Sequence, residues 1–293
     1  KSHKIRFKLR KMKRENKNIL TFLGTGGGSN ITYSQVRATG GLHLLLDNLP
    51  ILIDPGPGSL VWLRKMKLKE PELLLLSHLH IDHANDVNVI LDGMKNPRII
   101  AEKHCLELSE KYYPCVSKYH QSIASFIRSV EGDEVISSKE MNLQKEDIKI
   151  FVAKSEHHAP CVGFKIVGSK IIGYTSDGIY YENQEKSFEN CDLIIFNVLV
   201  PYGGYRNDSE KKHMSVSDVI NFLNSMKNDT KPRVAILQHF SFSMLKNNVY
   251  KQAKIVEENT GIKTIAAKDF MQIDLDTLEI LQKNDNLGLR KFI

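Results

Sequence analysis

A seven-residue segment with three histidines and one aspartate, residues 77–83, constrains this chain more than any other feature. It directly follows four consecutive leucines, an apolar run typical of a buried strand. His78 and His80 are two residues apart and therefore point to the same side of an extended segment. Asp82 and His83 lie beyond the strand end and turn toward a second point. The spacing favours two adjacent metal ions over a solvated, histidine-rich turn.

Three later segments place a histidine or an aspartate at the end of an apolar run, where sites are commonly built on strand scaffolds. His157 lies between two expected strands, at residues 148–153 and 162–167. Asp177 and His239 each follow another apolar run. Any one of them alone is typical of a cap or turn residue. Together they supply the further ligands that a metal site needs.

In this order, these residues resemble the motifs of the metallo-β-lactamase fold superfamily of binuclear metallohydrolases. The resemblance runs from about residue 19 to about residue 275. It includes the glycine-rich segment 20–28, similar to the first strand and loop of that superfamily, and Asp54, which ends a strand and would support the ligands. The implied fold is α/β, a four-layer αββα sandwich with the metals at the edge between two sheets.

Carried over residue by residue, the resemblance also implies a ligand set and a nucleophile. A water or hydroxide between the metals would attack the substrate, and Asp82 would also orient or deprotonate it. Imidazole and carboxylate donors without a thiolate suit two divalent ions, with Zn²⁺ expected first and Mn²⁺ or Fe²⁺ as alternatives. His158 is an alternative to His157, but the family spacing before Pro160 selects His157. The first metal would be held by His78, His80 and His157, the second by Asp82, His83 and His239, and Asp177 would bridge both.

Two segments resemble one branch of the superfamily, the ribonuclease Z group and the related cyclic-phosphodiesterase group. The first joins His157 to Pro160, Gly163 and Phe164, and the second, 212–218, contains His213. The resemblance implies that His213 assists phosphodiester cleavage. When protonated, it would stabilise negative charge or protonate the leaving oxygen. We therefore expect a metal-dependent phosphodiesterase acting on a small cyclic or nucleotide compound or on RNA. A ribonuclease Z-like RNA endonuclease and an acyl (thioester or lactone) hydrolase are the alternatives.

The chain departs from ribonuclease Z in two places. Residues 55–60 replace that group's acidic stretch, and no Gly/Pro-rich arm for gripping tRNA is evident. Residues 101–146 instead read as a helical insertion, broken at Pro114. Arg206, in a polar loop, could hold a phosphate in a forked contact, although a solvated cation is the more common use of such a residue.

Length and composition predict one large domain, residues 18–293, after a basic segment at 1–17. That segment has nine Lys or Arg residues against one acid, an excess of positive charge larger than the net charge of +7 of the whole chain. It is expected to be solvated and mobile, or to attract a polyanion such as nucleic acid. The absence of an apolar stretch long enough to span a membrane, of a signal-peptide pattern and of a disulfide framework predicts a cytoplasmic protein. The resemblance allows a homodimer.

Two other features have simple expected uses. His43 alternates with leucines and is predicted to lie on a strand face rather than to act in catalysis. The glycines at positions 24, 26, 27 and 28 could suggest a dinucleotide loop, but the turn-like residues after them favour close backbone packing beside the metal site.

Overall fold

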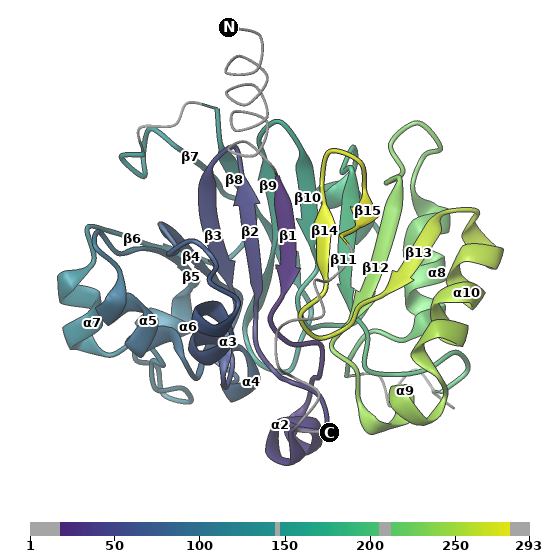
Figure 1. The fold of residues 1–293 in the computed structure, drawn as a ribbon, viewed down its shortest axis with the longest axis horizontal. Helices are drawn as coiled ribbons and strands as arrows, with labels where there is room; N and C mark the ends of the chain where they lie inside the picture. The colour runs from purple at the N-terminus through teal and green to yellow at the C-terminus, as the bar shows by residue number, and fades with distance from the viewer. Residues whose placement is uncertain (1–17, 144–146, 205–211, 282–293) are drawn as a thin grey trace, which may run out of the picture.

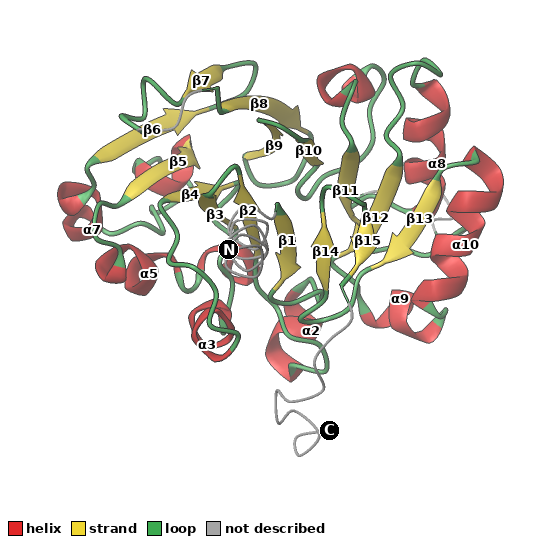
Figure 2. Cartoon of the chain, turned by 45° about the horizontal axis from the view of Figure 1, so that its top comes forward, coloured by secondary structure: helices red, strands yellow, loops and turns green. Residues whose placement is uncertain are grey.

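The computed structural model describes residues 18–143, 147–204 and 212–281. The basic segment 1–17 and Arg206 lie outside these residues. Two β-sheets pack face to face, and helices cover their outer faces (Figures 1 and 2). This is the expected four-layer α/β sandwich. In the described part of the chain, the first sheet has eight strands in the order β15 (Glu279–Ile280), β14 (Gln272–Asp274), β1 (Ile19–Phe22), β2 (Leu42–Leu46), β3 (Leu49–Ile53), β4 (Leu73–Leu76), β5 (Arg98–Glu102) and β6 (Phe126–Val130).

The second sheet contains the later strands of the chain. Strands β10 to β13 are parallel to one another, as are β3 to β6 in the first sheet. The described order is β13 (Lys263–Ala266), β12 (Val234–Gln238), β11 (Leu193–Asn197), β10 (Ile171–Tyr174), β9 (Cys161–Val167), β8 (Lys149–Ser155) and β7 (Val135–Ser137).

The parallel strands are apolar along their whole length because both of their faces are covered. All residues of β4, β11 and β12 are buried. One set of side chains, including Leu44, Phe164 and Ile195, fills the space between the sheets. The carboxyl ends of parallel strands meet at the same edge of a sheet, so polar residues that follow β3, β4, β10 and β12 are brought together there.

Helices complete the two outer layers. Leu74 of the first sheet packs with Ile90, and Phe196 of the second packs with Phe222. The helices on the first sheet are α3 (Ser59–Lys65), α4 (Ile81–Ala84), α5 (Val87–Gly93), α6 (Lys103–Leu106) and α7 (Lys118–Ile123). The helices on the second sheet are the 3₁₀ helix η1 (Gln184–Phe188), α8 (Val216–Ser225), α9 (Phe242–Lys246) and α10 (Val249–Thr260). Helix α2 (Ser29–Ser34) lies at the lower edge in Figure 1.

The expected helical insertion at 101–146 is helical only in part. Its helices are the short α6 and α7, and β6 and β7 extend the first and second sheets within the same segment. The prediction followed apolar and polar spacing, but residues 126–130 pair with β5 and become a strand through that tertiary contact. No helix in the described residues is long and apolar enough to cross a membrane.

Candidate metal centre

The candidate ligands converge at the edge of the sandwich where the parallel strands end. His78 and His80 follow β4, whereas Asp82 and His83 lie within α4, which begins at Ile81. Asp177 follows β10 by three residues. In the described chain, two groups of these side chains have candidate ligand atoms within 4.8 Å of one another: His78, His80, His157 and Asp177, and Asp82, His83 and His239.

The first group is built around His80. Its Nδ1 lies 3.0 Å from Nε2 of His78 and 3.4 Å from Nε2 of His157. His78 is fully buried, and His80 and His157 are half-buried. Burial lowers the pKa of His157 to about 3 and that of His78 well below its usual value, which leaves these imidazoles neutral. Neutral imidazole nitrogens are the form that binds metals.

The second group is built around His239. Its Nε2 lies 3.1 Å from Nε2 of His83 and 3.3 Å from Oδ2 of Asp82. Asp177 connects the two groups, because its Oδ1 is 3.4 Å from Nε2 of His239 and its Oδ2 is 4.0 Å from Nε2 of His78. The carboxylate therefore faces both sets of imidazoles, as a bridging ligand would.

The charges in this cluster fit divalent cations. Burial opposes the charged form of His83, but the carboxylates of Asp177, Asp82 and Asp54 outweigh it and raise the pKa of His83 well above its usual value. Burial also opposes charge on Asp177, yet His239 and His83 hold the pKa of that carboxyl well below its usual range. Buried carboxylates that attract a proton onto a neighbouring imidazole would be neutralised equally by a metal ion.

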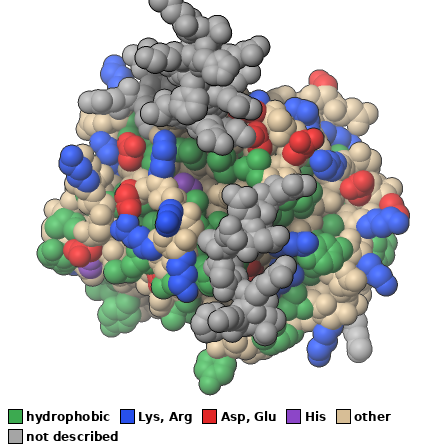
Figure 3. All heavy atoms as spheres, in the orientation of Figure 1, with side chains coloured by type: hydrophobic (Ala, Val, Ile, Leu, Met, Phe, Trp, Pro, Cys, Tyr) green, Lys and Arg blue, Asp and Glu red, His purple; other side chains and the backbone are tan. Residues whose placement is uncertain are grey.

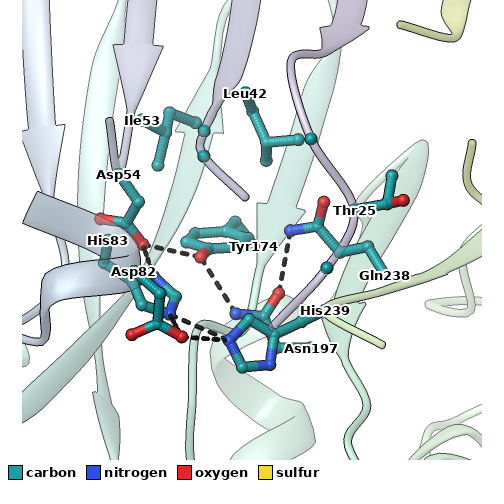
Figure 4. Close-up of a pocket in the computed structure, with 14 residues that line it drawn as sticks. Thr25, Leu42, Ile53, Asp54, Asp82, His83, Tyr174, Asn197, Gln238 and His239 are labelled. Carbon is teal, nitrogen blue, oxygen red and sulfur yellow. Dashed lines mark hydrogen bonds and ion pairs between the residues drawn. The ribbon is translucent and has the colours of Figure 1, made fainter. Parts of the chain in front are cut away.

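Asp54 supports the second group through its contact with His83, as the resemblance implies. Its carboxylate accepts hydrogen bonds from the backbone N–H of Ser77 (2.7 Å) and from Ser77 Oγ (2.6 Å). It also accepts one from Tyr174 Oη (2.7 Å) and lies 3.0 Å from His83 Nδ1 (Figure 4). A carboxylate on Nδ1 fixes the ring so that Nε2 faces the metal. Asp54 and His239 both have a positive φ, 50° and 63°, and such backbone strain is concentrated at functional sites.

Three supporting residues were missed by the sequence analysis. Asn197 Nδ2 donates to Asp177 Oδ1 (2.8 Å) and to Tyr174 Oη (3.1 Å), and Gln238 Nε2 donates to Asn197 Oδ1 (2.9 Å). Figure 4 shows the bonds from Gln238 to Asn197 and from Asn197 to Tyr174 within the second sheet, and the bond from Tyr174 to Asp54 that crosses to the first sheet. Tyr174, Asn197 and Gln238 are each the last residue of an apolar strand. The same position in the sequence predicted site residues only where it held a histidine or an aspartate.

The glycine run has the structural use expected of it. A Cβ atom on Gly27 would overlap the ring of His239, and the backbone N–H of Gly28 donates to Oδ2 of Asp82 at 2.9 Å. Residues 29–34, expected to be turn-like, form the short helix α2. His43 is buried on strand β2, where its Nε2 lies 2.9 Å from the carbonyl oxygen of Lys69, away from the cluster.

His213 lies beside the first group. Its Nδ1 is 3.5 Å from Oδ2 of Asp177, and its ring centroid is 4.9 Å from that of His157. The residue precedes α8, which begins with a capping box formed by Ser215 and Asp218. Burial lowers the pKa of His213 to about 4.

Comparisons with known proteins agree with this architecture. The chain is 31% identical over 269 residues to the uncharacterized protein MJ1374 of Methanocaldococcus jannaschii, covering 87% of this chain and 94% of that one. The metallo-β-lactamase fold protein YhfI of Bacillus subtilis has a similar structure, with a TM-score of 0.67 and 19% identity over 88% of this chain and 99% of YhfI. The short form of human tRNase Z (ELAC1) has a TM-score of 0.59 and 19% identity, with coverage of 88% and 99%.

The family model for the beta-lactamase superfamily domain matches residues 50–240, more than half of the chain. The matched region begins within β3 and ends just after His239, so it includes Asp54 and all seven candidate ligands. The chain therefore belongs to the β-lactamase superfamily and has the metallo-β-lactamase fold.

Proposed function

We propose that this protein is a metal-dependent phosphodiesterase. The observation that best supports this function is the position of His213, whose Nδ1 lies 3.5 Å from Oδ2 of Asp177 at the side of the ligand cluster. The segment around His213 resembles the segment that carries a histidine in the phosphodiester-cleaving branch of the superfamily. Members of the superfamily that hydrolyse thioesters or β-lactams do not need this histidine.

The two groups of side chains would hold two divalent ions. His78, His80 and His157 would bind one, Asp82, His83 and His239 the other, with Asp177 between them. Zn²⁺ is the first candidate, and Mn²⁺ or Fe²⁺ are alternatives. When bound, two such ions polarise a phosphoryl oxygen and make water acidic enough to react near neutral pH. Asp82, held by the N–H of Gly28, would orient the attacking water and accept its proton.

His213 acts in this proposal as a neutral hydrogen-bond donor. Burial lowers its pKa to about 4, so the protonated form expected from the sequence is scarce at pH 7 in the metal-free protein. A neutral imidazole still carries one N–H. Directed at a phosphoryl oxygen, that donor stabilises the negative charge that grows during attack.

Small phosphodiesters are the first substrates to test, before RNA. On the described part of the face in Figure 3, Lys and Arg side chains are interspersed with Asp, Glu and apolar side chains. A long nucleic acid is usually bound by a continuous basic surface. The resemblance in fold to tRNase Z keeps RNA ends as the second class to test.

The test is hydrolysis of bis(p-nitrophenyl) phosphate by protein of known metal content, with Zn²⁺ and Mn²⁺ compared. We expect metal-dependent turnover that falls by about 10²-fold in His213→Ala. His120→Ala is the matched control, because His120 is on α7 and contacts Ser117 and Tyr119 rather than the cluster. Turnover of a thioester or lactone panel in place of the phosphodiester, with little effect of His213→Ala, would refute the proposal.

A further inference from the structure

His158 is an exposed histidine next to the metal cluster but outside its two groups of ligands. Its ring centroid lies 4.8 Å from that of His80, 4.0 Å from that of His157 and 6.1 Å from that of His213. The other three rings are partly buried. His158 therefore stands on the solvent side of the cluster, where a substrate must approach.

The segment that departs from ribonuclease Z holds the backbone of this histidine. Tyr112 Oη donates to the carbonyl oxygen of His158 at 3.3 Å. The ring of Tyr112 lies 5.6 Å from that of His104, whose Nδ1 is 2.8 Å from Oε1 of the buried Glu102 at the end of β5. A chain of contacts therefore runs from the first sheet to the loop that carries His158. It is a support that a solvated loop residue would not need.

We propose that His158 is a substrate-binding residue that donates a hydrogen bond to a phosphoryl oxygen, and that Tyr112 is its positioning residue. This inference rests on the proposed phosphodiesterase function. The imidazole has an N–H donor at any protonation state, and exposure allows a substrate oxygen to replace water on it. The ammonium of Lys111, 5.0 Å from the ring centroid of Tyr112, adds positive charge at the same rim, which suits an anionic substrate.

A role as metal ligand is the competing use of His158. Its candidate ligand atom lies within 4.8 Å of those of His157 and His213. This third group shares His157 with the first, and its other two members lie outside the set of seven. If His158 binds substrate, its removal leaves the first group of ligands intact and metal content unchanged. If His158 is a metal ligand, its removal lowers metal content.

The experiment compares His158→Ala, His158→Asn and Tyr112→Phe with the wild type and with Tyr113→Phe. Tyr113 is 82% exposed, so its variant controls for loss of a tyrosine hydroxyl in the same loop. Three quantities are measured: metal content, kcat and KM for bis(p-nitrophenyl) phosphate, and the Kd of inorganic phosphate for metal-loaded protein by calorimetry.

We expect unchanged metal content and an increase of about tenfold in both KM and the phosphate Kd in His158→Ala, with kcat within about threefold, the scale of one charge-assisted hydrogen bond. His158→Asn should recover part of the loss, and Tyr112→Phe should weaken binding in the same direction by about threefold. Tyr113→Phe should match the wild type.

The inference is overturned if His158→Ala retains wild-type KM and phosphate Kd, if it loses metal, or if the wild type binds no phosphate. Its failure is distinct from that of the proposed function. A wild type that cleaves phosphodiesters while His158→Ala behaves identically refutes only the role of His158. A wild type without phosphodiesterase activity refutes the function, whatever phosphate binding shows.

Discussion

Tyr174 Oη donates a 2.7 Å hydrogen bond to Oδ2 of Asp54, which joins the two sheets directly behind the candidate metal centre. Tyr174 ends β10 of the second sheet, and Asp54 follows β3 of the first. Both side chains are buried. Burial and the charge of Asp54 raise the pKa of Tyr174 well above its usual value, so its hydroxyl remains a donor. The same carboxylate of Asp54 orients His83. The position of the second sheet relative to the first therefore affects the orientation of this candidate metal ligand.

Tyr174→Phe should weaken both the fold and metal binding. Removal of a donor to a buried carboxylate should cost about 1.5–3 kcal/mol of unfolding free energy, measured by urea denaturation. Loss of a partner that orients a ligand commonly lowers metal affinity by about 10–100-fold. Tyr180→Phe is the control, because its hydroxyl contacts Glu185 and Ser225 instead. Equal metal affinity in both variants would contradict the link between Asp54 and the site.

Gly27→Ala should reduce metal binding at the second group selectively. The added Cβ would overlap the ring of His239, which must move away from His83 and Asp82. Metal analysis should then give about one equivalent of metal where the wild type binds two. Gly93→Ala is a matched control, because a Cβ added to Gly93 would lie 3.8 Å from Nη2 of Arg64, an ordinary van der Waals distance. Full occupancy of both sites in Gly27→Ala would count against the placement of His239.

Asp177→Ala should lower metal content to one equivalent or less and abolish turnover. The carboxylate faces both groups, and its removal leaves two sets of imidazoles without their shared anion. Metal removal by a chelator should abolish wild-type turnover in the same way, and added Zn²⁺ or Mn²⁺ should restore it in the wild type alone. Asp133→Ala, at an exposed ion pair with Lys154, should keep both metal and activity. Unchanged metal content and rate in Asp177→Ala would refute a binuclear centre.

His43 should make the metal-free fold less stable in mild acid. Burial lowers its pKa to about 4, below the value near 6.5 of an unfolded chain. The unfolded state therefore binds more protons between these values, and stability falls as the pH drops from about 6.5 to about 4. This contribution, at most about 3 kcal/mol, should be missing from His43→Leu. Urea denaturation of both proteins at pH 7 and pH 5 measures it, and an equal loss in both would exclude His43 as a cause.

Features that depend on residues close together in the chain could be predicted from the sequence. Apolar runs predicted the buried strands β4, β10 and β12, because a strand covered on both faces needs apolar residues throughout. The spacing of His78, His80, Asp82 and His83 indicated two facing sets of donors.

Contacts between residues far apart in the chain could be seen only in the folded structure. The bond from Tyr174 to Asp54 joins residues 120 positions apart, and that from Gln238 to Asn197 joins residues 41 apart. Such pairs follow from strand order and from how two sheets face each other, and neither leaves a local pattern. For the same reason, residues 126–130 became strand β6 on pairing with β5, and the contact of Tyr112 with His158 could not be anticipated.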